Sequence, residues 1–251
     1  MNIQFAVKDD EIFLIEVNPR ASRTVPFVSK SIGHPLAKYA TWLMLGQKLS
    51  DIGFSYKTPE SVSVKETVFP FISFSGADTE LGPEMESTGE VMGRGENLEE
   101  AFLKAQVAAY QSEIKEGHIF IGVTDQDKQG MVPAALEFQK AGRKILATEG
   151  TYKVLQKAGV TNIEKTSLDR ENPDNIFDYI DRKEVALIVN TTRPRKRSVD
   201  AKHIRRVALM RNLPYFTTVE GTLNIACAIV ATDSGKKLNY KSLLISSKNS
   251  S

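Results

Sequence analysis

The sequence is poor in the residues that build disulfides and metal clusters. Its 251 residues include one cysteine, Cys227, and three histidines. A single cysteine excludes an intrachain disulfide and a zinc cluster built from several cysteines, and it is typical of a protein from the reducing cytoplasm. The sequence also has no apolar run that approaches the roughly 18 residues of a membrane span, so we expect no membrane partner.

A large net charge is also missing. The 33 lysine and arginine residues nearly balance the 31 aspartate and glutamate residues, and the formal net charge is +2. A chain this close to neutral has little long-range attraction for nucleic acid or an anionic membrane. One short basic run, Arg193–Arg197, has no aromatic residues between its charges. We expect it to be either a solvated loop or a loop that helps to bind an anionic ligand through Arg195.

The N-terminal segment predicts a β-hairpin. Apolar and polar residues alternate at the start of the chain, Asp9–Glu11 marks a turn, and a second strand follows over residues 12–17. Because Met1 leads directly into this strand pattern, we expect no signal peptide. A chain that opens in this way is expected to be a piece of a larger protein.

The two strands are predicted to bring oxygen-bearing side chains to one face. Glu16 and Asn18 are two residues apart on the second strand, so they point to the same side. A three-residue turn would place Gln4 directly across from Glu16. Carboxylate and amide oxygens can hold Mg²⁺ beside a nucleotide phosphate, and Arg20 and Arg23 can bind a phosphate through their forked donors. A solvated strand edge explains Glu16 and Asn18 alone, whereas the whole stretch favours a metal and phosphate site.

From about Gly117 onward the sequence alternates between strand and helix patterns. Short apolar runs predict strands over residues 118–124, 144–147, 162–165, 184–190 and 215–217. Five strands alternating with helices predict an α/β fold, in which a five-stranded parallel sheet has helices on both faces.

The region before this sheet has weaker patterns. It predicts a short helix over residues 41–49, a connector over 51–65, an irregular glycine-rich loop over 82–97, and a helix over 97–115 that Asn97 caps. We therefore expect three parts, which are residues 1–50, a connector with a helix at 51–116, and the α/β domain at 117–251.

Polar side chains follow the carboxyl ends of the predicted parallel strands. Ligands bind at this edge in α/β sheets, where helix N-termini offer free N–H groups to anions. Thr148-Glu-Gly-Thr151 follows the second strand and Asn190-Thr-Thr192 follows the fourth, while Lys128 and Lys165 follow the first and third. Helix capping alone can explain the threonines. Two such segments and two lysines at one edge favour a phosphate pocket.

The N-terminal stretches Met1–Ala6 and Ile15–Lys30 closely resemble the end of the second ATP-grasp domain of carbamoyl phosphate synthetase large subunits. The resemblance continues through Ser63-Val-Lys-Glu66 and Leu81–Gly93 and covers essentially the whole chain. It implies roles in metal, nucleotide and phosphate binding for the residues noted above. The implied metal ligands are Gln4, Glu16 and Asn18, and the implied catalytic residues at the phosphates are Arg20 and Arg23.

The C-terminal region resembles the methylglyoxal-synthase-like domain that ends the same subunit. This resemblance implies that UMP or IMP binds as an allosteric effector. The implied effector ligands are Lys128, Thr148, Thr151, Lys165, Asn190 and Thr192, to which Arg195 of the basic run would be added. An ornithine site is implied at Glu66, Tyr215 and Thr217. Two positions depart from the family pattern, since Gly122 replaces a serine of some relatives and Phe216 interrupts the usual Tyr-Asp-Thr-Thr.

The resemblance also implies a function and partners. It describes a glutamine-hydrolysing ligase of the cytoplasm that makes carbamoyl phosphate for the pyrimidine and arginine pathways. Its cofactors are ATP and Mg²⁺ or Mn²⁺, and its partners are the rest of the large subunit and a glutaminase small subunit, in an oligomer. The glycine-rich phosphate loop and the adenine-binding segment of an ATP-grasp site are not in this sequence, so we expect this chain alone to be inactive.

Two alternatives to this interpretation stay open. A free-standing lyase of the methylglyoxal synthase type would need an aspartate beside a glycine-rich phosphate segment. Asp169 and Asp174 lie in the corresponding part of the domain, but those glycines do not. The other alternative is a structural or oligomerisation fragment that binds no nucleotide.

Overall fold

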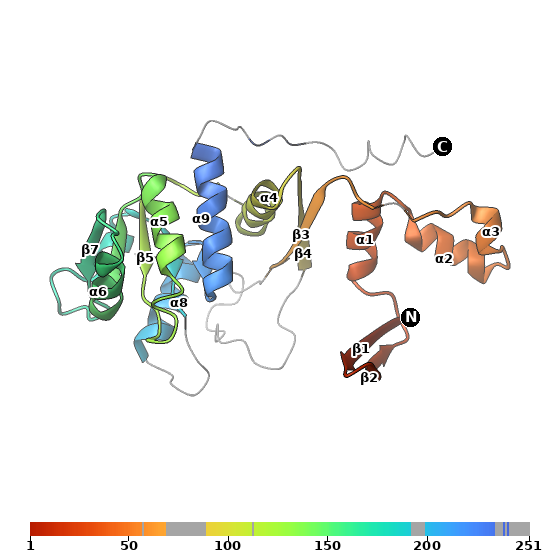
Figure 1. Cartoon of the computed structure of the whole chain (residues 1–251), viewed down its shortest axis with the longest axis horizontal. Coiled ribbons are helices and arrows are strands. Elements are labelled where there is room, and N and C mark those ends of the chain that lie inside the picture. Colours follow the sequence, from red (N-terminus) through yellow and green to blue (C-terminus); the bar gives the residue numbers. More distant parts are fainter. Residues whose placement is uncertain are drawn as a thin grey trace. The chain divides into compact units, whose positions relative to one another are not determined.

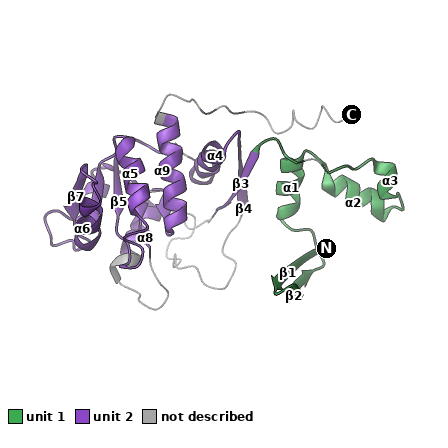
Figure 2. Cartoon of the chain, viewed as in Figure 1, with its two compact units in different colours: residues 1–61, 239–251 green, residues 62–238 purple. Residues whose placement is uncertain are grey.

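A computed structural model describes most of the chain as two compact units. The described residues are 1–56, 58–68, 89–111, 113–191 and 199–233 with Leu238 and Tyr240, without the side chains of 199–202 and 233. Unit 1 contains Met1–Ser61 and Asn239–Ser251, of which only Tyr240 belongs to the described residues, and unit 2 contains Val62–Leu238 (Figure 2). Among the described residues, no helix is long and apolar enough to cross a membrane.

Unit 1 consists of a hairpin and three short helices. These are β1 (Asn2–Lys8), β2 (Glu11–Asn18), α1 (Thr24–Ile32), α2 (Leu36–Met44) and α3 (Leu49–Ile52) (Figure 1). The predicted three-residue turn is wrong. Asp9 and Asp10 both have positive φ, at 50° and 64°, and they form a two-residue turn that suits the twist of a hairpin.

The predicted pairing of Gln4 with Glu16 nevertheless forms, by a different route. Phe5 pairs with Leu14, but the register shifts by one residue before Gln4 pairs with Glu16. The extra residue in β2 is therefore Ile15, at a bulge. The shorter turn and the extra residue at the bulge shift the register in opposite directions, so Gln4 and Glu16 still face each other as predicted.

The helices of unit 1 differ from the prediction. We expected one helix over residues 41–49, whereas α2 begins at Leu36 and ends at Met44, and α1 was not predicted. Both helices end near glycines with positive φ, Gly33 at 72° and Gly46 at 94°. None of the residues in α1, α2 or α3 is buried.

Unit 2 contains the predicted five-stranded parallel sheet. The strands are β5 (His118–Ile121), β6 (Ile145–Thr148), β7 (Ile163–Thr166), β8 (Val185–Val189) and β9 (Tyr215–Phe216). Their order in the sheet is β7-β6-β5-β8-β9, and every neighbouring pair is parallel. The prediction of an α/β fold is therefore confirmed.

Helices cover both faces of this sheet, as predicted (Figure 1). Ile119 and Ile121 pack into one core and Phe120 packs into the other, because successive strand residues point to opposite faces. The first core receives α4 (Leu98–Tyr110), α5 (Val132–Lys140), α6 (Glu149–Lys157) and α9 (Val219–Asp233). The second core receives α7 (Ile176–Asp181) and α8 (Val199–Met210).

A two-stranded antiparallel ribbon packs on α4. It consists of β3 (Val62–Val68) and β4 (Gly89–Gly95). β3 corrects the end of the predicted connector over 51–65, and β4 corrects the predicted irregular loop over 82–97 from Gly89 onward. Residues 82–88 of that loop lie outside the described residues. Two glycines of β4, Gly93 and Gly95, allow the strand to pack closely on α4. A Cβ on Gly93 would overlap the backbone of Ala101 and Ala105 in α4, so the strand and the helix approach more closely than any side chain allows.

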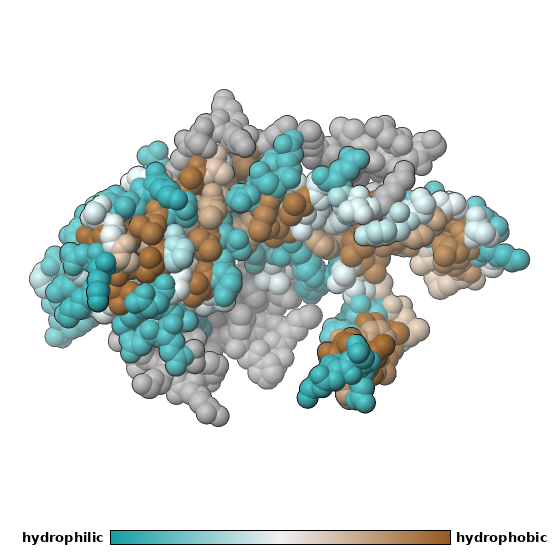
Figure 3. All heavy atoms as spheres, viewed as in Figure 1, coloured by the Kyte–Doolittle hydropathy of each residue, from teal (hydrophilic) through white to brown (hydrophobic). Residues whose placement is uncertain are grey.

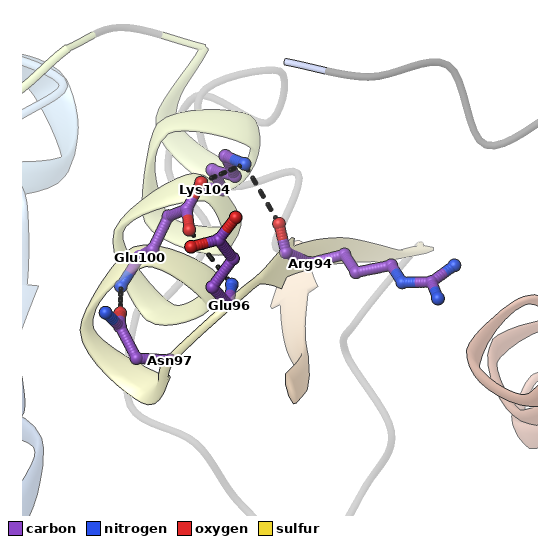
Figure 4. A network of polar contacts seen from close by, with 5 residues as sticks. All are labelled: Arg94, Glu96, Asn97, Glu100 and Lys104. Carbon is purple, nitrogen blue, oxygen red and sulfur yellow. Dashed lines mark hydrogen bonds and ion pairs between the residues drawn. The ribbon is translucent and has the colours of Figure 1, made fainter. Parts of the chain in front are cut away.

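A polar network joins β4 to the first turn of α4 (Figure 4). The Asn97 side chain accepts a hydrogen bond from the Glu100 N–H at 2.9 Å, which confirms the predicted cap. The Glu100 carboxylate accepts from the Glu96 N–H and pairs with Lys104, whose ammonium also donates to the Arg94 carbonyl at 3.0 Å. The helix is thereby fixed on the ribbon, although it ends at Tyr110 rather than at the predicted residue 115.

Candidate functional site

The polar residues predicted from the sequence lie at the carboxyl edge of the five-stranded sheet. Successive strands are added in opposite directions from β5, so the crevice expected for a ligand lies between β5 and β8. The Asn190 side chain crosses it and donates from Nδ2 to the Gly122 carbonyl at 2.6 Å. Asn190 is 5% exposed, so its amide is held firmly inside the edge.

Next to this crevice, the first turn of α6 has an unusual cap. Thr148 is the N-cap residue, but its side chain makes no capping hydrogen bond. The Thr148 hydroxyl donates instead to the hydroxyl of Thr151, 3.2 Å away. Thr151 is fully buried. Capping alone therefore does not explain this pair, and the N–H groups of the turn are left without that side-chain acceptor.

The ammonium of Lys128 lies against the same turn. A Cβ on Gly150 would overlap Lys128 Nζ, so the ammonium lies directly against the backbone of Gly150. The positive end of a helix dipole repels a cation, and here the exposed carboxylate of Asp125 pairs with Lys128 at 2.5 Å. An anion bound between the lysine and the helix N-terminus would be attracted by both.

Lys165 adds a second positive charge near α6. It is exposed, and it pairs in register with Ala147 just before Thr148. The pKa of Glu149, the first residue of α6, is lowered mainly by its hydrogen bond with Lys153 and further by the charge of Lys165. Four predicted effector ligands, Lys128, Thr148, Thr151 and Lys165, therefore gather around the start of α6. Thr192 and Arg195 lie outside the described residues.

The sequence analysis missed a carboxylate that organises this edge. Asp127 Oδ2 accepts hydrogen bonds from the hydroxyls of Thr124 and Thr191, each at 2.6 Å. The Thr191 hydroxyl also accepts from the Thr124 N–H at 3.1 Å. These contacts tie the loop after β5 to the end of β8. The signal for them was Thr124, which ends the first predicted strand, and Asp127 three residues later.

The predicted ornithine residues come from two strands of unit 2, β3 and β9, and from the residue after β9. Tyr215 donates from its hydroxyl to Asn190 Oδ1 at 3.1 Å, and Thr217 is exposed just beyond β9. Glu66 lies on β3, where its carboxylate accepts from Gln106 Nε2 at 2.8 Å and from the Thr67 N–H at 3.3 Å. Burial raises the pKa of Glu66 despite these two hydrogen bonds. A partly buried carboxylate of this kind is suited to a cation.

The predicted metal ligands share one face of the hairpin in unit 1. Gln4 lies opposite Glu16, and Asn18 Nδ2 donates to Glu16 Oε1 at 2.7 Å. Arg20 donates to the Ala21 carbonyl at 3.3 Å, and Arg23 directly precedes α1. The three hairpin residues supply oxygen ligands of the type that Mg²⁺ takes, but only one negative charge, so further ligands would have to complete a site.

Two family models match the chain. Residues 1–52 match "Carbamoyl-phosphate synthase L chain, ATP binding domain", and residues 130–217 match "MGS-like domain". The carbamoyl phosphate synthase large chain of Mesorhizobium japonicum is 44% identical over 94% of this chain and 21% of its own length. The large chain of Methanobrevibacter smithii is 46% identical over 97% of this chain and 23% of its own length. The chain therefore spans about a fifth of the length of these curated relatives.

Proposed function

Since the chain is homologous to the C-terminal region of the carbamoyl phosphate synthase large chain, we propose that it is the effector-binding end of such a synthase. The complete enzyme is an ATP-dependent, glutamine-hydrolysing ligase in the cytoplasm. It would join this chain to the rest of the large subunit and to a glutaminase small subunit, in an oligomer. This chain alone would be inactive, because most of the ATP-binding domain is not in its sequence.

Within this proposal, the three expected parts keep separate roles. Residues 1–50 would complete the ATP-binding domain, where Gln4, Glu16 and Asn18 would hold Mg²⁺ or Mn²⁺ beside ATP. Arg20 and Arg23 would contact the phosphates there. Residues 51–116 would connect this part to the regulatory domain at 117–251.

The regulatory ligand would be a nucleoside monophosphate, UMP or IMP. The observation that carries this proposal is the meeting of Lys128, Lys165 and an N-cap threonine without a capping bond at the start of α6. A phosphate bound there would accept hydrogen bonds from the N–H groups of the helix and pair with both ammonium groups. Asn190 and the residues after it would lie beside the ribose.

Binding would exchange one partner of Lys128 for another. In the free chain, Lys128 forms an ion pair with Asp125. The Asp125 side chain is 93% exposed, so breaking this ion pair costs little free energy. A phosphate would take the place of that carboxylate. An effector regulates activity only if it binds two states of the enzyme differently, so this exchange must be coupled to a contact outside the pocket.

A second ligand, ornithine, would bind at Glu66 with Tyr215 and Thr217. Glu66 supplies the negative charge that an amino group needs. Its surroundings on β3 and α4 withdraw it partly from water, which strengthens the attraction to a cation.

Calorimetric titration of the full chain with UMP and IMP tests the nucleotide site. We expect saturable binding that becomes about tenfold weaker in Lys128→Ala and in Lys165→Ala, because each loses one charge-assisted contact with phosphate. Lys140→Ala is the matched control, since this lysine pairs with Glu137 on the surface of α5. If neither nucleotide binds the folded chain, or if the control weakens binding equally, the proposed pocket is wrong.

No observation favours the lyase alternative. The Asp169 carboxylate accepts the Glu171 N–H at 3.0 Å within the turn after β7, and the Asp174 carbonyl accepts from the Thr166 hydroxyl. These contacts shape the loop and do not place a catalytic base beside the start of α6.

A further inference from the structure

A series of hydrogen bonds leads from the proposed nucleotide pocket to α4. The Tyr215 hydroxyl donates to Asn190, and the Tyr215 backbone N–H donates to the hydroxyl of Tyr110 at 3.1 Å. Tyr110 is the last residue of α4 and lies 105 positions earlier in the chain. One tyrosine hydroxyl thus joins the ribbon-bound helix to the strand that holds Asn190 in place.

The same helix carries the partner of Glu66. Gln106 and Tyr110 are four residues apart on α4, so their side chains lie on one face of the helix. Gln106 is 4% exposed, and its amide donates to Glu66. The backbone carbonyl of Tyr110 accepts from Asn212 Nδ2 at 2.9 Å, which fixes the end of the helix against the loop before β9.

The Tyr110 hydroxyl is suited to respond to charge at Glu66. Burial raises its pKa and the nearby negative charge of Glu66 raises it further, against the effect of the Tyr215 N–H. The hydroxyl therefore stays protonated and accepts from Tyr215 while keeping its own proton. Neutralising Glu66 changes the electric field at the O–H dipole of Tyr110. This hydroxyl is largely buried, so the field is only weakly screened by water.

We propose that Tyr110 is a positioning residue that couples the state of Glu66 to the orientation of the Asn190 side chain. The Tyr110 hydroxyl holds the Tyr215 N–H, and the Tyr215 hydroxyl in turn holds Asn190 Oδ1. If the proposed function is right, a cation at Glu66 and a nucleotide at Asn190 alter each other's affinity through this tyrosine. Such coupling acts equally in both directions, by thermodynamic linkage.

Nuclear magnetic resonance of the ligand-free full chain tests the coupling itself. Glu66→Gln removes the charge but keeps the size of the side chain. We expect it to shift the side-chain amide resonances of Asn190, and we expect that shift to fall at least about threefold when Tyr110→Phe is also present. Tyr179→Phe is the matched control, because the hydroxyl of Tyr179 contacts Glu164 on β7.

Tyr215→Phe provides a second test that does not depend on the folding of the Tyr110 variant. It keeps the backbone N–H but removes the hydroxyl that binds Asn190, so the response to Glu66→Gln must also be lost. The proposal is overturned if Glu66→Gln leaves Asn190 unshifted, or if the shift persists at full size in Tyr110→Phe or Tyr215→Phe. A merely structural role of Tyr110 would leave the response to Glu66→Gln in place.

Titrations with ligand separate this inference from the proposed function. In the wild-type chain, saturating ornithine should change the dissociation constant of UMP about fivefold, the lower end of typical allosteric coupling. In Tyr110→Phe that ratio should move clearly towards one while UMP still binds, because only the contact of ornithine with Tyr215 would remain as a link to Asn190. Failure of UMP to bind any variant contradicts the proposed function, whereas an unchanged ratio in Tyr110→Phe contradicts the role of Tyr110.

Discussion

The two units carry candidate sites of similar chemistry on very different supports. In unit 2, Asn190 lies beside strands whose apolar residues are nearly all buried, and both atoms of its amide have protein partners. In unit 1, the metal candidates lie on a hairpin in which Phe5 is 57% and Ile15 is 63% exposed. A two-stranded hairpin is at best marginally stable by itself. The sheet edge is thus held by its own core, whereas the hairpin has no such core among the described residues.

The largest effect on stability should come from disrupting the core of unit 2. Phe120 is fully buried in the sheet and Phe13 is 49% exposed on the hairpin. Phe120→Ala should lower the free energy of unfolding of unit 2 by about 4 kcal/mol, because it removes a buried ring and leaves a cavity. Phe13→Ala should change the free energy of unfolding of unit 1 by less than about 0.5 kcal/mol.

The two units can be followed separately in one urea titration. The only tryptophan of the sequence, Trp42, lies in unit 1, so its fluorescence reports on that unit. Far-UV circular dichroism reports mainly on the larger unit 2. Equal losses of stability in the Phe120 and Phe13 variants would show that the two units do not differ as described.

A somewhat smaller effect should come from separating α4 from its ribbon. Gly93→Ala should destabilise unit 2 by about 3 kcal/mol, because the new Cβ meets the backbone of Ala101, which cannot rotate away. Gly89→Ala on the same strand is the control, since its Cβ would meet no atom of the described residues within 4 Å. Urea titration compares the two, and a similar loss in both would mean that close packing does not explain Gly93.

Glu66 should make the stability of unit 2 depend on pH. Burial places its pKa above the ordinary value, so between those two values the native state binds more protons than the unfolded state. The free energy of unfolding therefore falls as pH rises through that interval. Glu66→Gln has no carboxyl group to titrate, so the stability of this variant relative to wild type should increase as the pH rises above about 4, the ordinary pKa of glutamate.

Glu149→Gln supplies the opposite control for that measurement. The pKa of Glu149 is lowered by its hydrogen bond with Lys153, so its ionised form favours the native state, and the variant should lose stability relative to wild type as pH rises. Urea titrations at several pH values compare the slopes. The same sign in both variants would contradict the burial argument for Glu66.

The sequence predicted the sheet and most of its edge because both follow from periodicity and chain order. Five apolar runs separated by helices leave few arrangements, and parallel strands bring their carboxyl ends to one edge. The sequence did not predict β4, because Gly93 lowers strand propensity and its role depends on contact with α4. It also did not show that Tyr110 meets Tyr215, since that contact joins residues 105 positions apart. In unit 1, the pairing of Gln4 with Glu16 was predicted although the turn was wrong.

The smallest predicted effect tests whether Lys128 is held ready for an anion. Asp125 pairs with the ammonium of Lys128 and its own side chain is almost fully exposed, so Asp125→Asn should leave the fold intact. Removing the competing carboxylate should make UMP bind about threefold more tightly, as expected for an exposed ion pair worth less than 1 kcal/mol. Asp181→Asn is the control, because Asp181 pairs with Arg211 and its ion pair lies outside the strand edge. Weaker binding in Asp125→Asn would mean that Asp125 positions Lys128 for phosphate instead of competing with it, and the exchange of partners proposed for this site would have to be abandoned.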